Sequence, residues 1–272
     1  MQSFLALPKE IIQSFLSNRA LIFSLTRREI LGRYQGSVIG IMWSFINPLF
    51  MLLIYTFIFS VVFKARWTAG SDSKTEFALV LFAGLIVFNL FAECISKSPG
   101  IITSNVNYVK KVIFPIEILP FVLLGAALFH SLVSVFIWLL VYTALYGLPH
   151  VTVLLLPAIL LPLMLLIIGV SWFLAALGVY LRDLNQFVGM LVTVIMFLSP
   201  IFYPASALPE KYQMFLMFNP ISPVIEQFRD VLYWGILPNW TTYLRGLCIS
   251  LVCALLGFSW FKNTRSGFAD VL

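Results

Sequence analysis

The side chains that could do chemistry in this 272-residue sequence are few and far apart. The two histidines, His130 and His150, are separated by much of an apolar run, so neither an HExxH zinc motif nor a His/Asp/Ser grouping exists. The GxxxxGK[ST] pattern of a P-loop is also missing from the sequence. Three isolated cysteines without CxxC spacing indicate neither a disulfide framework nor a metal site. We therefore expect no catalytic residue, no metal site and no nucleotide bound by a P-loop of this chain.

Two groups of ionisable residues lie within or beside apolar segments. His130 falls near the middle of an apolar run, which by default makes it a functional candidate. A neutral histidine bonded to a neighbouring helix is the favoured alternative. Glu226, Arg229 and Asp230 fall at helical spacing, and Glu226 could form an ion pair with Arg229. We expect a structural role for that pair.

A basic collar precedes the first long apolar run. Arg27, Arg28, Glu29 and Arg33 are followed by thirty residues, 34–63, without Asp, Glu, Lys or Arg. About 20 apolar residues of helix cross a bilayer, and basic residues beside a span stay in the cytoplasm. Asn47-Pro48 inside this run predicts a kink, either packed against another helix or lining a polar cavity.

The composition excludes a soluble protein. Hydrophobic residues make up 61% of the chain, charged residues only 10%, and the mean hydropathy is +1.00. The net charge of +6 does not indicate nucleic-acid binding, because the basic residues flank apolar runs, which is the pattern that sets membrane topology. The chain is predicted to be a polytopic membrane protein.

The apolar runs predict an all-α integral membrane fold with six transmembrane helices in a single domain, 1–272. The expected spans are 36–63, 77–96, 118–146, 151–181, 187–203 and 243–261. Region 1–34 is expected to be cytoplasmic and to begin with an amphipathic helix over 8–19, which lies in the membrane interface or packs on the protein's own end. Region 97–117 is predicted to be a cytoplasmic loop with a short helix. Region 204–240 is rich in proline and half apolar, which favours short re-entrant helices.

The distribution of basic residues gives the expected orientation. With both termini inside, eleven of the seventeen Lys and Arg residues fall on the cytoplasmic side. We find no internal repeat in the six spans, so an inverted-repeat transporter has no support. Aromatic residues are 16% of the chain. Interfacial belts explain them best, with rings that line a conduit for sugars as the alternative.

Several stretches resemble the permease subunits of ABC transporters that export polysaccharides and lipid-linked glycans, especially the O-antigen branch. The stretches that carry the resemblance are RREILGRYQGSVIGIMWSFINPLF at 27–50, NVNYVKKVIFPIEILP at 105–120, LSPIFYP at 198–204, NPISPVIEQFRDVLYWG at 219–235 and GFADVL at 267–272. One departure is Ile116, where the family often has a basic residue.

The resemblance implies the partners and the place in the cell. It implies a homodimer in the bacterial cytoplasmic membrane that binds two copies of a separate ATPase, with ATP and Mg held by that ATPase and no cofactor in this chain. It further implies a lipid-linked polysaccharide substrate, surrounding membrane lipids and no nucleic acid. The polymer would thread between the two subunits along a channel lined partly by aromatic rings.

The resemblance also implies roles for three sets of residues. The ATPase interface would be formed by Arg27, Arg28, Glu29, Arg33 and Tyr34. The coupling and gate loop would hold Asn105, Asn107, Lys110 and Lys111. The outer gate would be formed by Ser199, Pro200, Tyr203, Asn219, Pro220, Glu226 and Arg229.

Three other functions remain open at this point. An ABC exporter of drugs, haem or lipid would come from the same superfamily. A membrane enzyme or scramblase acting on lipid-linked sugars is disfavoured, because the spans lack paired carboxylates or an Asp-rich loop that could hold a metal and pyrophosphate. A purely structural anchor is disfavoured by the broken, charged segment between spans five and six.

Overall fold

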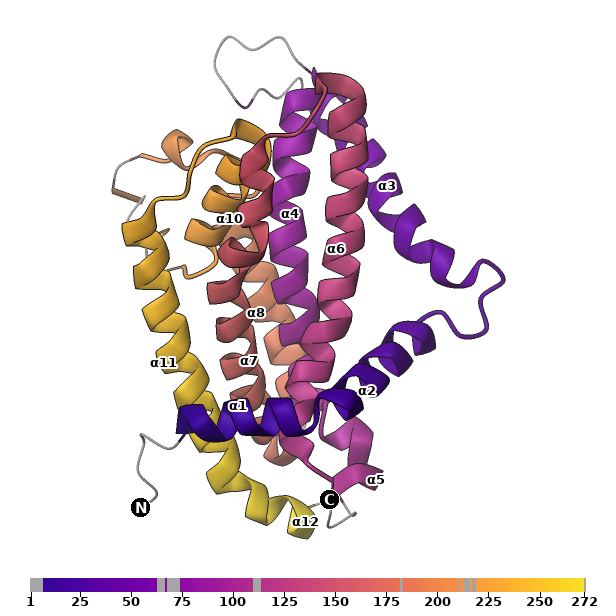
Figure 1. Ribbon diagram of the computed structural model, residues 1–272, viewed down its shortest axis with the longest axis vertical. Coiled ribbons are helices and arrows are strands. Elements are labelled where there is room, and N and C mark those ends of the chain that lie inside the picture. Colours follow the sequence, from indigo (N-terminus) through magenta and orange to yellow (C-terminus); the bar gives the residue numbers. More distant parts are fainter. Residues whose placement is uncertain are drawn as a thin grey trace.

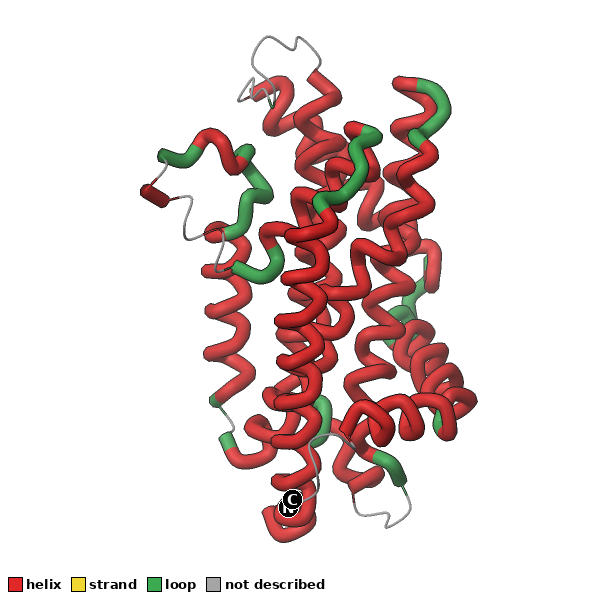
Figure 2. The backbone as a smooth tube through the Cα atoms, turned by 60° about the vertical axis from the view of Figure 1, so that its left-hand side comes forward, coloured by secondary structure: helices red, strands yellow, loops and turns green. Residues whose placement is uncertain are grey.

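The computed structural model describes residues 7–62, 67, 74–109, 114–181, 183–209, 211–212, 216 and 219–271. All regular elements in these residues are helices (Figure 2). Five helical stretches there are long and apolar enough to cross a membrane. They are Gly40–Phe59, Thr75–Gly100, Ile116–Tyr146, Val151–Tyr180 and Trp240–Gly267. The all-α integral membrane fold is thereby confirmed, whereas the number of six spans stays a prediction.

Helix α4 (Lys74–Lys97) forms the centre of the bundle. Its hydrophobic residues face neighbours on nearly every side, and 83% of its most apolar window is buried. A helix that is apolar all round is stable only when other helices surround it or lipid does. Around α4 pack α6 (Leu119–Tyr146), α7 (Leu156–Tyr180), α8 (Leu184–Leu198) and α10 (Ser222–Arg229), as Figure 1 shows.

Helix α11 (Trp240–Thr264) packs along α7 with the two backbones in contact. A Cβ atom at Gly257 would clash with the carbonyl group of Gly169, and one at Gly169 would lie 2.6 Å from the carbonyl oxygen of Cys253. Small residues permit such an approach between helices in membranes. The α7 and α11 helices therefore depend on this pair of glycines for their separation.

The N-terminal helix α1 (Leu7–Ser17) lies across one end of the bundle (Figure 1). Leu7 is buried, and the carboxylate of Glu10 accepts a 2.6 Å bond from Lys262 of α11. Ile12 and Leu16, in contrast, are 59% and 56% exposed. The two alternatives for this helix, packing on the protein and lying in the membrane interface, thus apply to different faces of it. One face packs on the protein, and the other face presents apolar side chains to a membrane interface.

Helix α2 (Arg19–Gly32) continues from α1, and α3 (Trp43–Tyr55) then rises at an angle to the bundle (Figure 1). Only 11% of the apolar window around α3 is buried. Pro48 lies inside α3, and Asn47 and Pro48 line a cavity between this helix and the bundle. Of the two alternatives for Asn47-Pro48, the structure thus favours the one in which this part of the helix lines a cavity.

At the other end of the molecule, the structure changes the bounds of one predicted span and adds detail to the predicted re-entrant region. The predicted span 187–203 is shorter in the structure, because α8 ends at Leu198. Ser199 is extended, with φ −91° and ψ 147°, and it precedes Pro200, which disfavours the helical conformation of the residue before it. In the predicted re-entrant region, α10 continues into the wide turn Asp230–Trp234.

Candidate functional site

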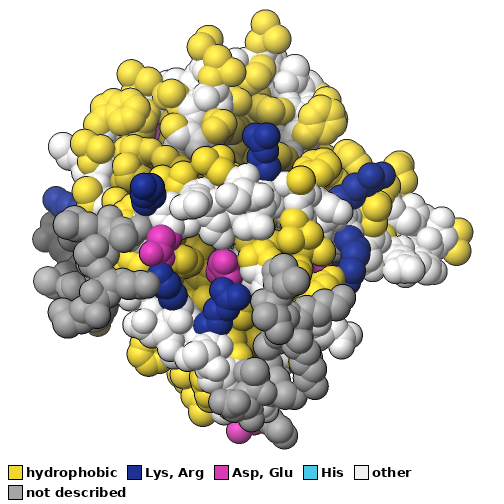
Figure 3. All heavy atoms as spheres, turned by 60° about the horizontal axis from the view of Figure 1, so that its bottom comes forward, with side chains coloured by type: hydrophobic (Ala, Val, Ile, Leu, Met, Phe, Trp, Pro, Cys, Tyr) yellow, Lys and Arg dark blue, Asp and Glu magenta, His cyan; other side chains and the backbone are white. Residues whose placement is uncertain are grey.

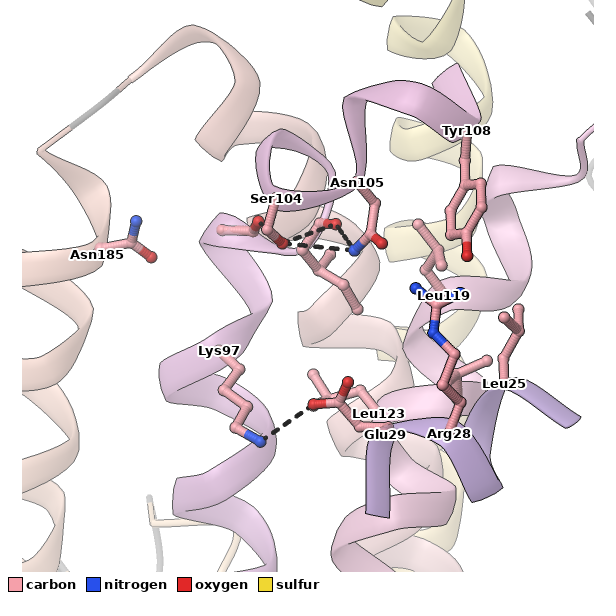
Figure 4. A pocket seen from close by; sticks show the side chains of 13 residues that line it. Leu25, Arg28, Glu29, Lys97, Ser104, Asn105, Tyr108, Leu119, Leu123 and Asn185 are labelled. Carbon is pink, nitrogen blue, oxygen red and sulfur yellow. Dashed lines mark hydrogen bonds and ion pairs between the residues drawn. The ribbon is translucent and has the colours of Figure 1, made fainter. Parts of the chain in front are cut away.

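Two of the five predicted ATPase-interface residues meet the predicted coupling loop at one cavity. This cavity has a volume of about 330 Å³ and lies between α2, the start of α6 and the segment after α4 (Figure 4). Arg28 and Glu29 of α2 line it opposite Asn105, and the guanidinium of Arg28 lies 6.0 Å from the ring centre of Tyr108. Two segments about 75 residues apart therefore share one site.

The loop after α4 owes its shape to local hydrogen bonds. It begins with the tight helical turns Ser98–Gly100 and Thr103–Asn105, and the short helix α5 (Val106–Val109) follows. The Nδ2 group of Asn105 donates to the carbonyl oxygen of Ile101 at 2.9 Å, which closes the turn. The predicted short helix in this loop is confirmed. Asn107 is exposed on α5, whereas Lys110 and Lys111 lie outside the described residues.

A second, larger cavity lies beside the first, between α3, α4 and α6. Its volume is about 470 Å³, and Glu93 of α4 is its central charged residue. The carboxylate of Glu93 accepts from Arg33 at 2.6 Å and from Lys97 at 3.3 Å, and it lies 3.1 Å from Nδ1 of His130. Lys97 also reaches Glu29 at 3.4 Å. One carboxylate thus connects the end of α2 with α4 and α6.

His130 fits the favoured alternative, a histidine bonded to a neighbouring helix. Its Nδ1 contacts Glu93 of α4 and lies 3.1 Å from Nη1 of Arg33. Its Nε2 is buried and has no hydrogen-bond partner within the described part of the chain. Tyr34 approaches the imidazole edge-on, with ring centres 6.3 Å apart. Arg33 and Tyr34 therefore turn toward the bundle, while Arg27 is exposed.

Charged side chains gather at this end of the molecule. Figure 3 shows dark blue and magenta side chains close together on the face that carries α1 and α2, with hydrophobic side chains around them. Among them, Nη1 of Arg265 lies 2.8 Å from the carboxylate of Glu117. Such an arrangement fits a membrane protein whose charged end lies in water.

Most of the predicted outer-gate residues come together at the other end, around a buried arginine. Arg229 is 3% exposed and donates to three backbone carbonyl oxygens: Val80 at 2.9 Å, Pro200 at 2.5 Å and Ile201 at 2.8 Å. Its guanidinium also lies 4.4 Å from the ring centre of Trp67. Arg229 therefore ties α10 to α4 and to the turn after α8.

A second hydrogen bond supports the same turn. The Nδ2 group of Asn219 donates to Oγ of Ser199 at 2.8 Å, and the hydroxyl of Ser199 donates to the carbonyl oxygen of Ile195 at 2.7 Å. The hydroxyl of Tyr203 donates to the carbonyl oxygen of Phe197 at 3.2 Å. Side chains that are 20 residues apart thus fix the exit from α8.

The expected ion pair between Glu226 and Arg229 is wrong. Among the described residues no ion pair joins them, because all three donor nitrogens of Arg229 bind backbone carbonyl groups. Glu226 lines a separate cavity, as does Pro220, between α7, α10 and α11. These two residues thus lie apart from the cluster around Arg229.

Sequence reasoning missed the central place of Glu93. The signal was present, since Glu93 is an acidic residue inside an apolar helix with Lys97 four positions later. Its partners Arg33 and His130 are 60 and 37 residues away, so only the fold brings them together. The carbonyl groups that bind Arg229 carry no sequence signal at all.

Comparisons with known proteins point to one group. The sequence model of the family described as "ABC-2 type transporter" matches residues 20–233. The chain is 27% identical over 262 residues to the O-antigen export system permease protein RfbA of Myxococcus xanthus, with 96% of this chain and 98% of that protein covered. It is 27% identical over 255 residues to the RfbA protein of Klebsiella pneumoniae, with 93% and 95% covered. The polysialic acid transport protein KpsM of Escherichia coli is 24% identical over 254 residues, with 92% and 95% covered.

Proposed function

Because the chain belongs to the ABC-2 type transporter family, we propose that it is the transmembrane subunit of an ATP-driven exporter of lipid-linked polysaccharide. O-antigen is the favoured polymer, with capsule or a teichoic-acid-like polymer as the other choices. The main support for this proposal is that the chain matches, over nearly its full length, proteins named as O-antigen export permeases. It also matches, more distantly, a polysialic acid transport protein. The membrane is the bacterial cytoplasmic membrane, and both termini are cytoplasmic.

The cavity between α2 and the following loop supports a route for the energy of ATP. A separate ATPase binds ATP and Mg, and two copies of it serve two copies of this chain. Its force reaches the membrane mechanically, through α2 with Arg27, Arg28 and Glu29. From there the cavity wall at Asn105 and the ion pairs of Lys97 pass displacement to α4. Asn107, Lys110 and Lys111 belong to the same coupling loop.

The exposed face of α3 supports a homodimer. Large apolar side chains cover this helix and the turn after it, and Phe50 and Leu53 of α3 and Phe57 of that turn are 59–61% exposed. A single exposed apolar patch of this kind marks an interaction surface in soluble proteins, and in a membrane it is open to lipid or to a second copy. A long polar polymer needs a continuous conduit, which two copies form between them and line partly with aromatic rings. The cluster around Arg229 closes its outer end.

The first experiment is deletion of the gene in its native host, followed by a gel of surface and intracellular glycan. We expect surface polymer to disappear and lipid-linked polymer to accumulate inside, because synthesis continues without export. Complementation with the wild-type gene is the control. Normal surface glycan together with sensitivity to a toxic small molecule would contradict the proposal and favour an exporter of drugs, haem or lipid.

A further inference from the structure

The cavity between α7, α10 and α11 has the features of a binding site that the function above does not use. It has a volume of about 330 Å³, which lies at the lower end of the range for small-molecule sites. It is lined by the N-terminal half of α11, which lies away from α1 in Figure 1. Its walls are largely apolar, with Ile159 and Pro162 from α7 and Ile249 from α11.

Three polar side chains of this cavity are available to a ligand. Ser222 is only 3% exposed, and its buried Oγ makes no hydrogen bond. Glu226 and Arg245, which line the same cavity, are exposed and form no ion pair or side-chain hydrogen bond with another described residue. Buried polar groups in proteins are normally satisfied, so the unpaired hydroxyl of Ser222 marks a missing ion, water or ligand. The cavity thus presents one anionic, one cationic and one hydroxyl group.

Along α11 the cavity continues into an apolar stripe. Ile249, Val252 and Leu256 follow Arg245 at intervals of three or four residues, so they lie on one face of the helix. They are 55%, 53% and 55% exposed, and Trp260 one turn further is 45% exposed. From Ile249 to Trp260 the helix rises about 16 Å, which is about half of a hydrocarbon core of about 30 Å.

We propose that this cavity holds the headgroup of a zwitterionic phospholipid with a primary ammonium group, with its acyl chains along the α11 stripe. The ammonium group binds the carboxylate of Glu226, and the phosphate binds the guanidinium of Arg245. The hydroxyl of Ser222 donates to a phosphate oxygen. Opposite charges in one pocket match a headgroup that carries both signs, and the length of the stripe matches one leaflet. The binding requires the membrane fold only and does not depend on which polymer is carried.

The test measures lipid binding to the full-length purified protein by native mass spectrometry. The probe is phosphatidylethanolamine, and phosphatidylglycerol with identical acyl chains is the comparison. We expect one tightly bound phosphatidylethanolamine per chain. Glu226→Gln and Arg245→Gln should each weaken it about tenfold or more, because each removes a hydrogen bond to a charged group. The control Arg19→Gln, an exposed residue of α2 at the other end, should have no effect.

A second pair of variants fills space without removing a charge. A Cβ at Gly246 would meet no atom within 4 Å, and Gly246 lines the cavity. Gly246→Leu should therefore fold, since leucine favours a helix over glycine, and should abolish tight binding. Gly189→Leu on α8 is the matched control, because its Cβ also meets no atom within 4 Å.

Four results would each overturn the proposal. One is equal binding of phosphatidylglycerol, which would make the cavity an anion site. Another is equal binding of water-soluble phosphoethanolamine, which would show that the apolar stripe plays no part. Unchanged binding in Gly246→Leu would place the lipid elsewhere. Efficient disulfide cross-linking between chains through the exposed Cys248 of α11 would show that a second copy covers this face.

Discussion

At the scale of single residues, the molecule satisfies a few buried charged groups in different ways. Arg229 donates hydrogen bonds to three backbone carbonyl oxygens, and two of these, in Pro200 and Ile201, belong to a turn. Glu93 is half-buried and instead contacts Arg33, Lys97 and His130 from separate segments. A fully buried charge is tolerated only with close partners, so removing Arg229 leaves its carbonyl partners unpaired inside the bundle.

Replacing Arg229 tests this satisfaction directly. We expect Arg229→Ala to destabilise the protein by about 3 kcal/mol or more, because three carbonyl groups lose their donor together. Arg229→Lys should recover only part of the loss, since one ammonium group cannot reach all three oxygens in the fork geometry of a guanidinium. Thermal unfolding in detergent measures both variants. Arg19→Ala, at an exposed site, is the control, and equal melting temperatures for all three would refute the role.

The Glu226 carboxyl offers a test by pH. Burial raises its pKa, the neighbouring carboxylate of Asp230 raises it further, and Arg229 opposes the shift. An ammonium group binds only the ionised carboxylate. As the pH is lowered, phospholipid binding should therefore be lost at a higher pH than it would be with a glutamate of ordinary pKa. The free energy of unfolding changes the other way, because the folded protein holds the proton more tightly and so gains stability as the pH falls.

Binding measured between pH 8 and pH 5 checks this expectation. Glu226→Gln provides the control, since an amide does not titrate and its weaker binding should stay constant over that range. Arg245 is the other charged group that lines the cavity. A wild-type profile as flat as that of the variant would contradict the proposed ammonium contact.

At the scale of elements, α2 is held to the bundle by one apolar cluster against α6 and by partly exposed charges. Ile22 is its one buried residue, and it packs with Ile118 and Val122. Beyond this small cluster, Lys97 reaches Glu29 of α2, and Arg33 at the C-terminal end of the helix binds Glu93. Ionic contacts that are partly exposed are weak singly, so this element can separate from the bundle at a lower free energy than a core helix.

Removing the charge of Glu93 should loosen that attachment. In Glu93→Gln we expect backbone hydrogen exchange over residues 19–33 to become about tenfold faster, because the amide replaces a charged acceptor of three donors. Hydrogen exchange with mass spectrometry in nanodiscs measures the rate. Glu117→Gln is the matched control, since it breaks the pair with Arg265 but leaves Glu93 intact. The same acceleration in both variants would argue against a specific role of Glu93.

At the scale of the whole molecule, the sequence predicts the apolar helices well because length and hydropathy are local properties. The spans 77–96 and 118–146 agree closely with α4 and α6. The early end of α8 was also readable in principle, since Pro200 restricts Ser199. The hydrogen-bond partners of Arg229 could not be predicted from the sequence, because every residue has a backbone carbonyl group. The contact between Arg33, Glu93 and His130 could not be predicted either, because it depends on how three segments pack.

The assembly gives a prediction at the same scale. In a background without native cysteines, Leu53→Cys on α3 should cross-link in membranes to a species of twice 30.8 kDa, because α3 lies at the proposed dimer contact. Leu132→Cys on α6 is the matched control, since Leu132 is 63% exposed and Leu53 is 59% exposed. Denaturing gels after mild oxidation show the outcome. Equal cross-linking at both positions would mean random collision, and none at Leu53 would contradict the contact.

The glycine contact between α7 and α11 restricts how the protein can change shape. Gly257 lies against the backbone of Gly169, and Gly178 lies equally close to the carbonyl group of Pro99 after α4. Helices that interlock in this way cannot slide or roll past one another without lifting apart, which membrane packing opposes. α4, α7 and α11 must therefore travel together as one rigid body. We expect any opening motion to involve α3 instead, because only 11% of its apolar window is packed against the rest of the molecule.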